Sequence, residues 1–309
     1  MATPQSEPSL AADPLSLGLH RGRLTGSVVG RAPELAAVEQ ELTSARGGMV
    51  CLTAEGEPGI GKTRLLLAIE EVTRAQGFIP IGITADEEIR GPFLLARSIF
   101  ASPAVLELAE GTPAERAVQR VADALASGDD AGLDSLAPDR KLLRVFDLAA
   151  LALRALAAER PVVILIDDLQ WADEDSLRML RYVIRVDASS PILLVLAMRP
   201  AGTAFVDEAV TLLADMERMG LLRRLKLGRL GQQESTELLQ QVLGGTLRLP
   251  AEVTGSQTFL CTSIRAADRP DSAPSGQSAR DRLADAADRR SPGACPGRGV
   301  VGCHPADER

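Results

Sequence analysis

Gly56-Glu57-Pro58-Gly59-Ile60-Gly61-Lys62-Thr63 matches the spacing G-x-x-x-x-G-K-[ST], a glycine-rich loop that ends in a lysine and a hydroxyl residue. Glycines allow such a loop to turn sharply and to direct its backbone N–H groups inward, where they can hold phosphate oxygens. The motif predicts that Lys62 reaches the β- and γ-phosphates and that the Thr63 hydroxyl joins the Mg²⁺ shell. The alternative is an ordinary surface turn rich in Gly and Pro.

The sequence on both sides of the loop favours the phosphate-binding interpretation. Met49–Ala54 is a short apolar run suited to a strand buried on both faces. A helical pattern follows over Thr63–Gln76 and stops at Gly77, and Phe78–Thr84 is a second apolar strand. Strand, loop, helix and strand together have the length of a parallel crossover unit.

A second chemical feature is the pair Asp167 and Asp168, which directly follows the apolar run Val162–Ile166. Ligands of parallel sheets gather at the carboxyl ends of the strands, so both acids are expected beside the loop. Asp167 is placed to hold Mg²⁺, commonly through water, and Asp168 to orient or deprotonate an attacking water. Capping of the next helix is the alternative role, which the upstream loop disfavours.

Two more side chains are candidates for the same crevice. Arg199 follows the apolar strand Pro191–Met198, where it could sense a γ-phosphate, and a surface salt bridge is the alternative. Trp171 is the only tryptophan. It is expected to pack the turn after the two acids, with adenine stacking as the alternative.

The rest of the pattern predicts an α/β fold of three layers around a mostly parallel sheet, because strands and helices alternate from Met49 to about Leu227. A helix is expected from Pro33 onward, and Gly128–Gly132 reads as an exposed linker. The other expected helices are Pro92–Phe100, Pro113–Ala126, Asp139–Glu159, Glu174–Arg185, Ala204–Met219 and Gln232–Leu243, with a last strand at Leu221–Leu227.

The composition is that of a globular protein and argues against a nucleic-acid-binding surface. The chain has 309 residues, enough to bury a core. Aromatic residues make up only 3%, which leaves few platforms for base stacking. The net charge of −8 opposes binding to phosphate backbones.

The sequence predicts a cytoplasmic protein. Met1–His20 is rich in Pro, Ser and Ala and lacks the order of a signal peptide. The most apolar helical stretch, Leu142–Ala157, is interrupted by charged residues and is not expected to span a membrane. Unligated thiols are expected for the four cysteines. These are Cys51, in a predicted buried strand, and Cys261, Cys295 and Cys303.

Taken together, these motifs resemble the nucleotide-binding module of the signal-transduction ATPases with numerous domains, a class of AAA-like P-loop ATPases. The likeness is greatest to the large ATP-binding regulators of the LuxR family in bacteria. It runs from about Val28 to Leu249. The resemblance rests on four segments: Val29-Gly30-Arg31 with Glu34-Leu35, the segment from Gly56 to Arg64, the run Asp167-Asp168-Leu169-Gln170-Trp171-Ala172-Asp173, and Arg199-Pro200.

The resemblance implies a cofactor and a switching function. It assigns Val29, Gly30 and Arg31 to the adenine and ribose pocket, and Arg199 to sensing of the γ-phosphate. ATP or ADP with Mg²⁺ is the implied ligand, and slow ATP hydrolysis would switch a regulator between resting and active forms. Self-association or a regulatory protein partner is implied, without direct contact of this chain with nucleic acid.

Composition and the resemblance together give the expected domain organisation. A disordered leader is expected at 1–24, the P-loop ATPase domain at 25–230, the start of a helical lid at 231–253 and a low-complexity tail at 254–309. Periodicity is lost after Gly255, where the family continues with more lid and ends in a DNA-binding domain. We therefore expect a truncation or frame shift near Thr254–Cys261, and a chain without its own DNA reader.

Three other functions stay open from sequence. One is an AAA-type motor or loader ATPase, which would need an arginine finger that the sequence does not assign among Arg181, Arg185 and Arg223. A second is the regulatory ATPase module of a cyclase or protein kinase. The third is a non-functional remnant with an incomplete lid. Rate of turnover and nucleotide-dependent assembly distinguish the first from a slow switch.

Overall fold

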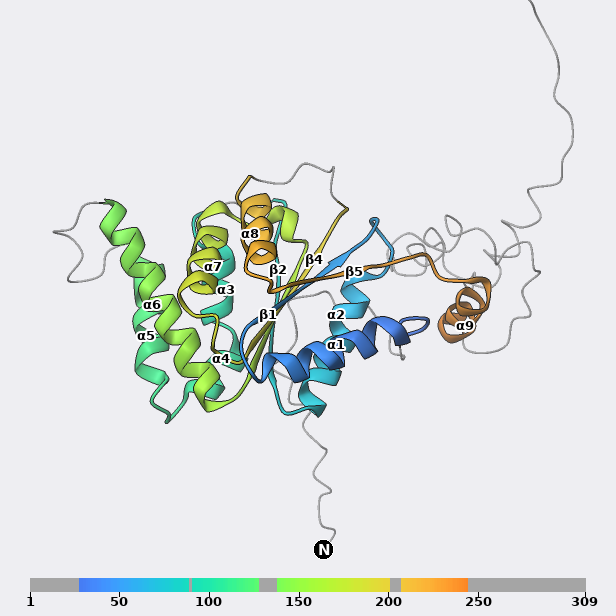
Figure 1. Cartoon of the computed structure of the whole chain (residues 1–309), viewed down its shortest axis with the longest axis horizontal. Coiled ribbons are helices and arrows are strands. Elements are labelled where there is room, and N and C mark those ends of the chain that lie inside the picture. Colours follow the sequence, from blue (N-terminus) through green and yellow to red (C-terminus); the bar gives the residue numbers. More distant parts are fainter. Residues whose placement is uncertain (1–27, 89–90, 128–137, 201–206, 244–309) are drawn as a thin grey trace, which may run out of the picture. The chain divides into compact units, whose positions relative to one another are not determined.

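The computed structural model describes residues 28–88, 91–127, 138–200 and 207–243, all of which belong to one compact unit, Met1–Leu249. The expected leader, the linker at Gly128–Gly132 and the expected tail lie outside the described residues. Figure 1 shows a central sheet with helices on both faces, and the fold is the expected three-layer α/β fold.

The strands are β1 (Val50–Glu55), β2 (Ile79–Thr84), β3 (Val162–Asp167), β4 (Ile192–Met198) and β5 (Leu222–Lys226). The helices are α1 (Ala32–Ala45), α2 (Lys62–Ala75), α3 (Leu94–Phe100), α4 (Pro103–Ala109), α5 (Glu115–Ser127), α6 (Pro138–Glu159), α7 (Glu174–Val186), α8 (Asp207–Arg218) and α9 (Gln232–Leu243), with a short 3₁₀ helix η1 (Leu169–Trp171).

Most elements agree with the sequence predictions to within one or two residues, and α9 has the predicted bounds. Helix α4 was not predicted. It is a single short helix, begun by Ser102, whose side chain accepts a hydrogen bond from the Val105 N–H. The predicted start of α8 at Ala204 lies outside the described residues.

The sheet has the strand order β2-β3-β4-β1-β5, and every neighbouring pair is parallel. The strands β1 and β2 are parallel, as the crossover length predicted, but β4 and β3 lie between them. Because β4 separates β1 from β3, its carboxyl end stands between the loop after β1 and the acids at the end of β3. This order brings three sequence-distant strand ends to one edge of the sheet.

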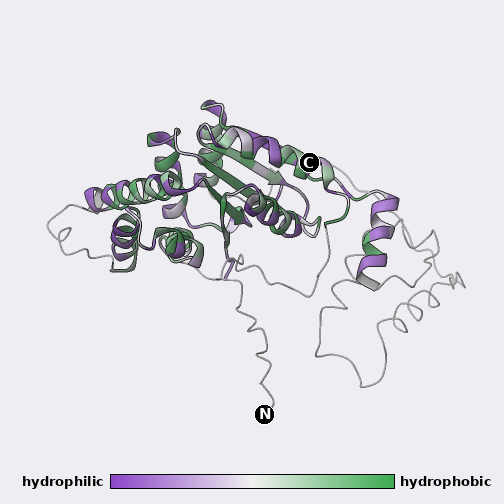
Figure 2. Cartoon of the chain, turned by 90° about the horizontal axis from the view of Figure 1, so that it is seen from below, coloured by the Kyte–Doolittle hydropathy of each residue, from purple (hydrophilic) through white to green (hydrophobic). Residues whose placement is uncertain are grey.

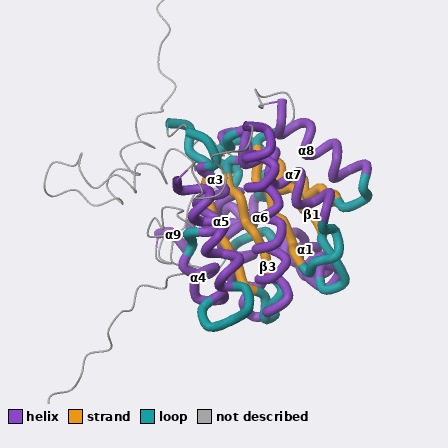
Figure 3. Tube along the Cα trace, turned by 90° about the vertical axis from the view of Figure 1, so that its left-hand side faces the viewer, coloured by secondary structure: helices purple, strands orange, loops and turns teal. Residues whose placement is uncertain are grey.

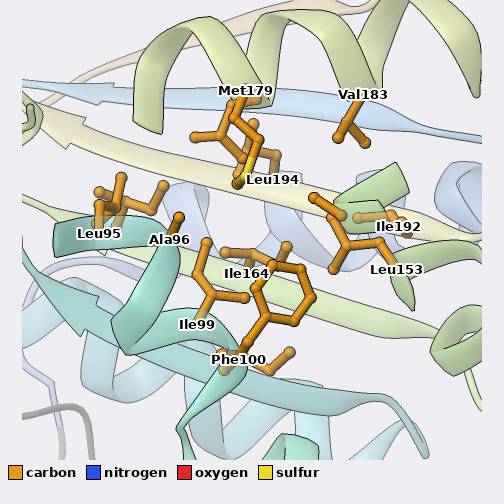
Figure 4. Packing of buried hydrophobic residues seen from close by; sticks show 14 of the residues in the cluster. Leu95, Ala96, Ile99, Phe100, Leu153, Ile164, Met179, Val183, Ile192 and Leu194 are labelled. Atoms are coloured by element: carbon orange, nitrogen blue, oxygen red, sulfur yellow. The ribbon is translucent and has the colours of Figure 1, made fainter. Parts of the chain in front are cut away.

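The core is divided by the sheet into two layers, because successive side chains of a strand point to opposite faces. On one face, Ile164 and Leu194 pack with α3, α6 and α7, and Figure 4 shows Phe100, Leu153 and Met179 in this cluster. On the other face, residues such as Val163 pack against α1 and α2. Figure 3 shows α5, α6 and α7 in front of the strands, on the face of the sheet that carries the larger of the two clusters.

The helices are amphipathic and the central strands are apolar on both faces, which Figure 2 shows as mixed purple and green helices around a green sheet. All six residues of β3 and all seven of β4 are buried. Cys51 is buried in β1, as predicted, and burial raises the pKa of its thiol to about 12. Among the helices that the structure describes, none has the length and apolar character needed to cross a bilayer.

Candidate functional site

The glycine-rich loop connects β1 to α2 at the carboxyl edge of the sheet. Its first residue donates a hydrogen bond from the Gly56 N–H to the Met198 carbonyl at the end of β4, over 3.2 Å. Gly61 adopts φ +101°, in the left-handed region, and precedes α2 without making a side-chain cap. The first N–H groups of a helix lack intrahelical partners, so the start of α2 presents donors and a positive dipole end to the loop.

Lys62 lies inside the loop instead of extending into solvent. Its Nζ donates to the carbonyls of Gly56, at 2.9 Å, and Glu57, at 3.1 Å, and the residue is only 7% exposed. Burial lowers the pKa of its ammonium, against the opposing influence of Asp168 and Asp167. The ammonium is thus held at the loop by weak neutral acceptors that an anion could replace.

The other loop residues differ in exposure. Glu57, Pro58 and Gly59 are exposed, and Gly61, Ile60 and Arg64 are half-buried. The carboxylate of Glu57 pairs with Arg229 at 3.2 Å, which ties the outer side of the loop to the segment before α9.

Thr63 and Asp167 form the direct contact between the loop and the acidic end of β3. The Thr63 hydroxyl donates to Asp167 Oδ2 over 2.5 Å. Asp167 is 2% exposed, and burial raises the pKa of its carboxyl, while the hydrogen bond from Thr63 acts in the opposite direction. The structure therefore brings together two oxygens from positions 104 residues apart in the sequence.

Asp168 occupies a strained backbone conformation one residue after Asp167. Its φ is +53°, in the left-handed region that a residue with a Cβ rarely adopts. Its N–H donates to Asp167 Oδ1 at 2.9 Å, and its side chain accepts a hydrogen bond from Gln170 Nε2 at 2.7 Å. The two carboxylates thus have different side-chain partners, Thr63 for Asp167 and Gln170 for Asp168.

Arg199 emerges from β4 between the loop and the two acids, as the strand order requires. Its guanidinium lies over the ring of Trp171, 5.5 Å from the centroid. Trp171 is half-buried and packs against the larger core cluster, which agrees with its predicted packing role. The Arg199 N–H donates to Gln170 Oε1 at 3.4 Å.

The segment Val29-Gly30-Arg31 lies beside the loop. Val29 is buried, and Arg31 is 6% exposed and donates from Nη2 to the Ile60 carbonyl and from Nη1 to Glu34, both at 3.0 Å. A Cβ at Gly30 would lie 2.7 Å from Glu234 Cδ, so the absence of a side chain lets the start of α9 approach. This segment thus contacts both the loop and the first turn of α9.

The structure gathers the predicted residues at one edge of the sheet and adds contacts that the sequence did not predict. These additions are Gln170, which bridges Asp168 and Arg199, and the pairs Arg229–Glu57 and Gly30–Glu234. Each joins residues from different motifs. In the sequence, Gln170 is marked by its place in the run Asp167–Asp173, where it is the polar residue between Leu169 and Trp171. Nothing local marks the other two contacts.

Comparisons with known proteins give one family match and several distant likenesses. A sequence model described as AAA ATPase domain matches residues 27–195. The Uncharacterized protein R02095 of Rhizobium meliloti (strain 1021) is 27% identical over 214 residues, which cover 58% of this chain and 19% of that protein. The chain therefore spans only 19% of the length of this curated relative.

Three solved structures are distantly similar. A DNA replication initiation factor has a TM-score of 0.42 at 15% identity, over 75% of this chain and 57% of its own. Domain III of the Thermotoga maritima replication initiation protein DnaA has a TM-score of 0.41 at 16% identity, and the match covers 79% of this chain and 85% of that chain. AMPPCP-bound DnaA from Aquifex aeolicus has a TM-score of 0.42 at 14% identity, and the match covers 81% of this chain and 65% of that chain.

Proposed function

The chain belongs to the AAA ATPase domain family and is a nucleotide-binding ATPase module, and we propose that it binds ATP with Mg²⁺ and hydrolyses it slowly as a molecular switch. One observation carries this proposal, the 2.5 Å contact between Thr63 Oγ1 and Asp167 Oδ2. It joins the phosphate loop to the acidic strand end, which are the two parts that phosphoryl transfer needs in one place.

The phosphates would bind in the loop Gly56–Thr63, at the start of α2. Backbone N–H groups of the loop and the helix dipole favour an anion there. Lys62 would exchange the carbonyls of Gly56 and Glu57 for phosphate oxygens, and this exchange is favourable because hydrogen bonds between charged groups are stronger than those to neutral acceptors. Arg64, in the first turn of α2, adds a further positive charge at this end of the helix.

The residues present fit a magnesium ion. Mg²⁺ prefers hard oxygen ligands and is usually bound through one or two carboxylates together with substrate phosphates. Thr63 and Asp167 supply a hydroxyl and a carboxylate oxygen side by side. When bound, the ion would neutralise charge on the transferred phosphoryl group. The hydrogen bond from the Thr63 hydroxyl also satisfies the buried Asp167 carboxylate.

Asp168 would orient or deprotonate the attacking water, and Arg199 would contact the γ-phosphate. Both positions follow from the strand order, since Arg199 leaves β4 between the loop and the end of β3. Trp171 holds the Arg199 guanidinium by a cation–π contact, which limits the volume that this side chain searches.

The adenine and ribose would lie beside Val29, Gly30 and Arg31, and the nucleotide state would be transmitted to α9. Arg31 contacts the loop through the Ile60 carbonyl, and Gly30 contacts α9 through Glu234. A nucleotide between these groups would bind one arrangement of α9 better than another, which is the requirement for a switch. We propose that this module serves a signal-transduction or transcriptional regulator, working by self-association or through a regulatory protein partner.

Equilibrium binding of ATP and ADP, each with Mg²⁺, tests the proposed site. For Lys62→Ala the affinity for ATP should fall by about 10- to 100-fold, the effect of losing one hydrogen bond between charged groups. Lys226→Ala is the matched control, because Lys226 is exposed on β5. Equal affinities of Lys62→Ala and the wild type for ATP would contradict the proposal.

Hydrolysis is tested separately by phosphate release at saturating ATP. Asp168→Asn should keep ATP affinity and lose at least about 100-fold in rate, as expected when a general base is removed. Slow turnover without nucleotide-dependent rings agrees with a switch. Fast turnover by a ring-shaped oligomer would identify a motor or loader ATPase instead.

A further inference from the structure

Gln170 is a buried glutamine that lies between Asp168 and the backbone of Arg199. It lies in the middle of η1 and is 3% exposed. Its Nε2 donates to Asp168 Oδ1 at 2.7 Å, and its Oε1 accepts from the Arg199 N–H at 3.4 Å. One carboxamide therefore joins the end of β3 to the end of β4.

The orientation of this carboxamide is determined by its partners. A carboxylate only accepts hydrogen bonds and a backbone N–H only donates, so Nε2 must face Asp168 and Oε1 must face Arg199. A side chain of similar length that carries only donors or only acceptors could bond to just one of these two partners, the Asp168 carboxylate or the Arg199 N–H. The pairing therefore requires a carboxamide and not merely a polar side chain of the right size.

Asp168 depends on such support because of its backbone conformation. A residue with a Cβ at φ +53° is strained and persists only when its surroundings hold it. Three hydrogen bonds do so: from the Asp168 N–H to Asp167, from the Trp171 N–H to the Asp168 carbonyl, and from Gln170 to the side chain. Only the last acts on the carboxylate itself and limits its rotation.

We propose that Gln170 is a positioning residue for ATP hydrolysis, which fixes the Asp168 carboxylate relative to the strand end that carries Arg199. This inference rests on the proposed function of Asp168 and Arg199. Gln170 itself does not contact nucleotide or water in this mechanism. It joins the carboxylate that would orient water to the backbone at Arg199.

The consequence of losing Gln170 is a change in rate and not in binding. The phosphate loop and Lys62 are not among its hydrogen-bond partners, so ATP affinity should be preserved. A carboxylate that rotates freely reaches the productive geometry for only part of the time. Small misplacements of reacting groups reduce rates by up to about 100-fold.

The experiment compares steady-state ATP hydrolysis by the full chain and two variants. Gln170→Met keeps the length and burial of the side chain and removes both hydrogen bonds, whereas Gln170→Glu keeps the acceptor for Arg199 and removes the donor to Asp168. We expect kcat to fall about 10- to 100-fold in both, with KM within about threefold of the wild type.

A matched control is available on α5. Gln119 Nε2 donates to Asp123 Oδ1 at 2.7 Å, the same contact on the exposed face of a helix far from the site in sequence. Gln119→Glu makes the same chemical change there and should leave kcat and KM at wild-type values. Thermal unfolding of each variant shows that the compared proteins are folded.

A double variant separates positioning from general stability. If Gln170 acts through Asp168, adding Gln170→Met to Asp168→Asn should not lower kcat below that of Asp168→Asn alone. The inference is overturned if Gln170→Met or Gln170→Glu keeps the wild-type kcat, if KM changes in place of kcat, or if the two losses multiply. A wild type that binds ATP but never hydrolyses it would overturn the proposed hydrolysis and this inference together, and so differs from failure of the inference alone.

Discussion

Lys62 is held by two loop carbonyls, which it would leave in the proposed complex with a phosphate group. The contacts to Gly56 and Glu57 keep the ammonium satisfied in a position where burial lowers its pKa. The ammonium is thus hydrogen-bonded to neutral acceptors, which phosphate oxygens would replace in the proposed complex. A buried charge without hydrogen bonds is costly, so the contacts to the two carbonyls also stabilise the loop.

A pH effect on stability should come from Asp167. Burial raises the pKa of this carboxyl, so the native state keeps its proton to a higher pH than the unfolded chain does. Between these two pKa values the free energy of unfolding therefore falls as the pH rises. An asparagine has no carboxyl to titrate, so the free energy of unfolding of Asp167→Asn should not fall in this way. Measured by urea unfolding without Mg²⁺, the stability of this variant relative to the wild type should therefore increase as the pH rises above about 4, the pKa of an aspartate in the unfolded chain.

Asp187 supplies a control of opposite sign. Burial is the largest single influence and raises its pKa, but hydrogen bonds from Arg154, Ser190 and Ser189 outweigh it and the net pKa is lowered. Its contribution to stability is present above about 4 and is lost as the pH falls through the native pKa. If the difference in free energy of unfolding between Asp167→Asn and the wild type does not change with pH, Asp167 does not have a raised pKa in the native state.

Gly61 should be intolerant of a side chain for a reason of backbone geometry alone. A Cβ there would meet nothing within 4 Å, but φ is +101°. We expect Gly61→Ala to lower the free energy of unfolding by about 1–2 kcal/mol, the cost of a left-handed conformation. Gly228→Ala is the control, because a Cβ there also meets nothing within 4 Å and φ lies outside the positive range.

These two substitutions differ only in backbone conformation. Gly228→Ala should be neutral or stabilise by up to about 1 kcal/mol, since it restricts the unfolded chain. Equal free energies of unfolding for the two variants, measured in urea, would show that the loop can rearrange around residue 61.

At the scale of elements, Asp173 connects two helices that start far apart in the sequence. Its carboxylate caps α7 by accepting from the Ser176 N–H, and it also accepts from the N–H groups of Phe93 and Leu95 at the start of α3. We expect Asp173→Ala to lower the free energy of unfolding by about 2–4 kcal/mol, because the cap and the hydrogen bonds from two further N–H groups are lost.

The matched control for this prediction is another helix cap. Ser102→Ala removes the cap of α4, which serves the Val105 N–H only, and should cost about 1 kcal/mol. Urea unfolding of both variants measures the difference. If Asp173→Ala costs no more than Ser102→Ala, the contacts to α3 contribute little.

The sequence predicted strands and long helices well because their periodic apolar residues are local patterns. It missed α4, whose seven residues alone show no helical period; α3 is equally short, but the pattern that predicted it ran over the longer stretch Pro92–Phe100. It placed Asp167, Asp168 and Arg199 near the loop by a rule about strand ends. It could not predict that Gln170 bridges two of them, because that contact depends on the order of β3 and β4 in the sheet.

For the molecule as a whole, the strand order determines which residues can act together. With β4 between β1 and β3, the loop, Arg199 and the acids stand next to one another in space although they are separated in sequence. The same edge receives the Val29–Arg31 segment, through Arg31 and the Ile60 carbonyl. A nucleotide bound there would touch groups from every part of this edge, so its effects should extend beyond the loop.

The last prediction concerns α9, measured by hydrogen exchange of backbone amides. Glu234 packs against Gly30, and its Oε2 also accepts from the Gly231 N–H at 2.6 Å. If the base of ATP lies beside Val29–Arg31, bound nucleotide should slow amide exchange in Gln232–Leu243 as well as in the loop, since a ligand of the native state suppresses local opening. ATP should protect α9 more than ADP does, because the γ-phosphate adds contacts. Protection confined to the loop, or equal with both nucleotides, would show that this module does not transmit its nucleotide state to α9.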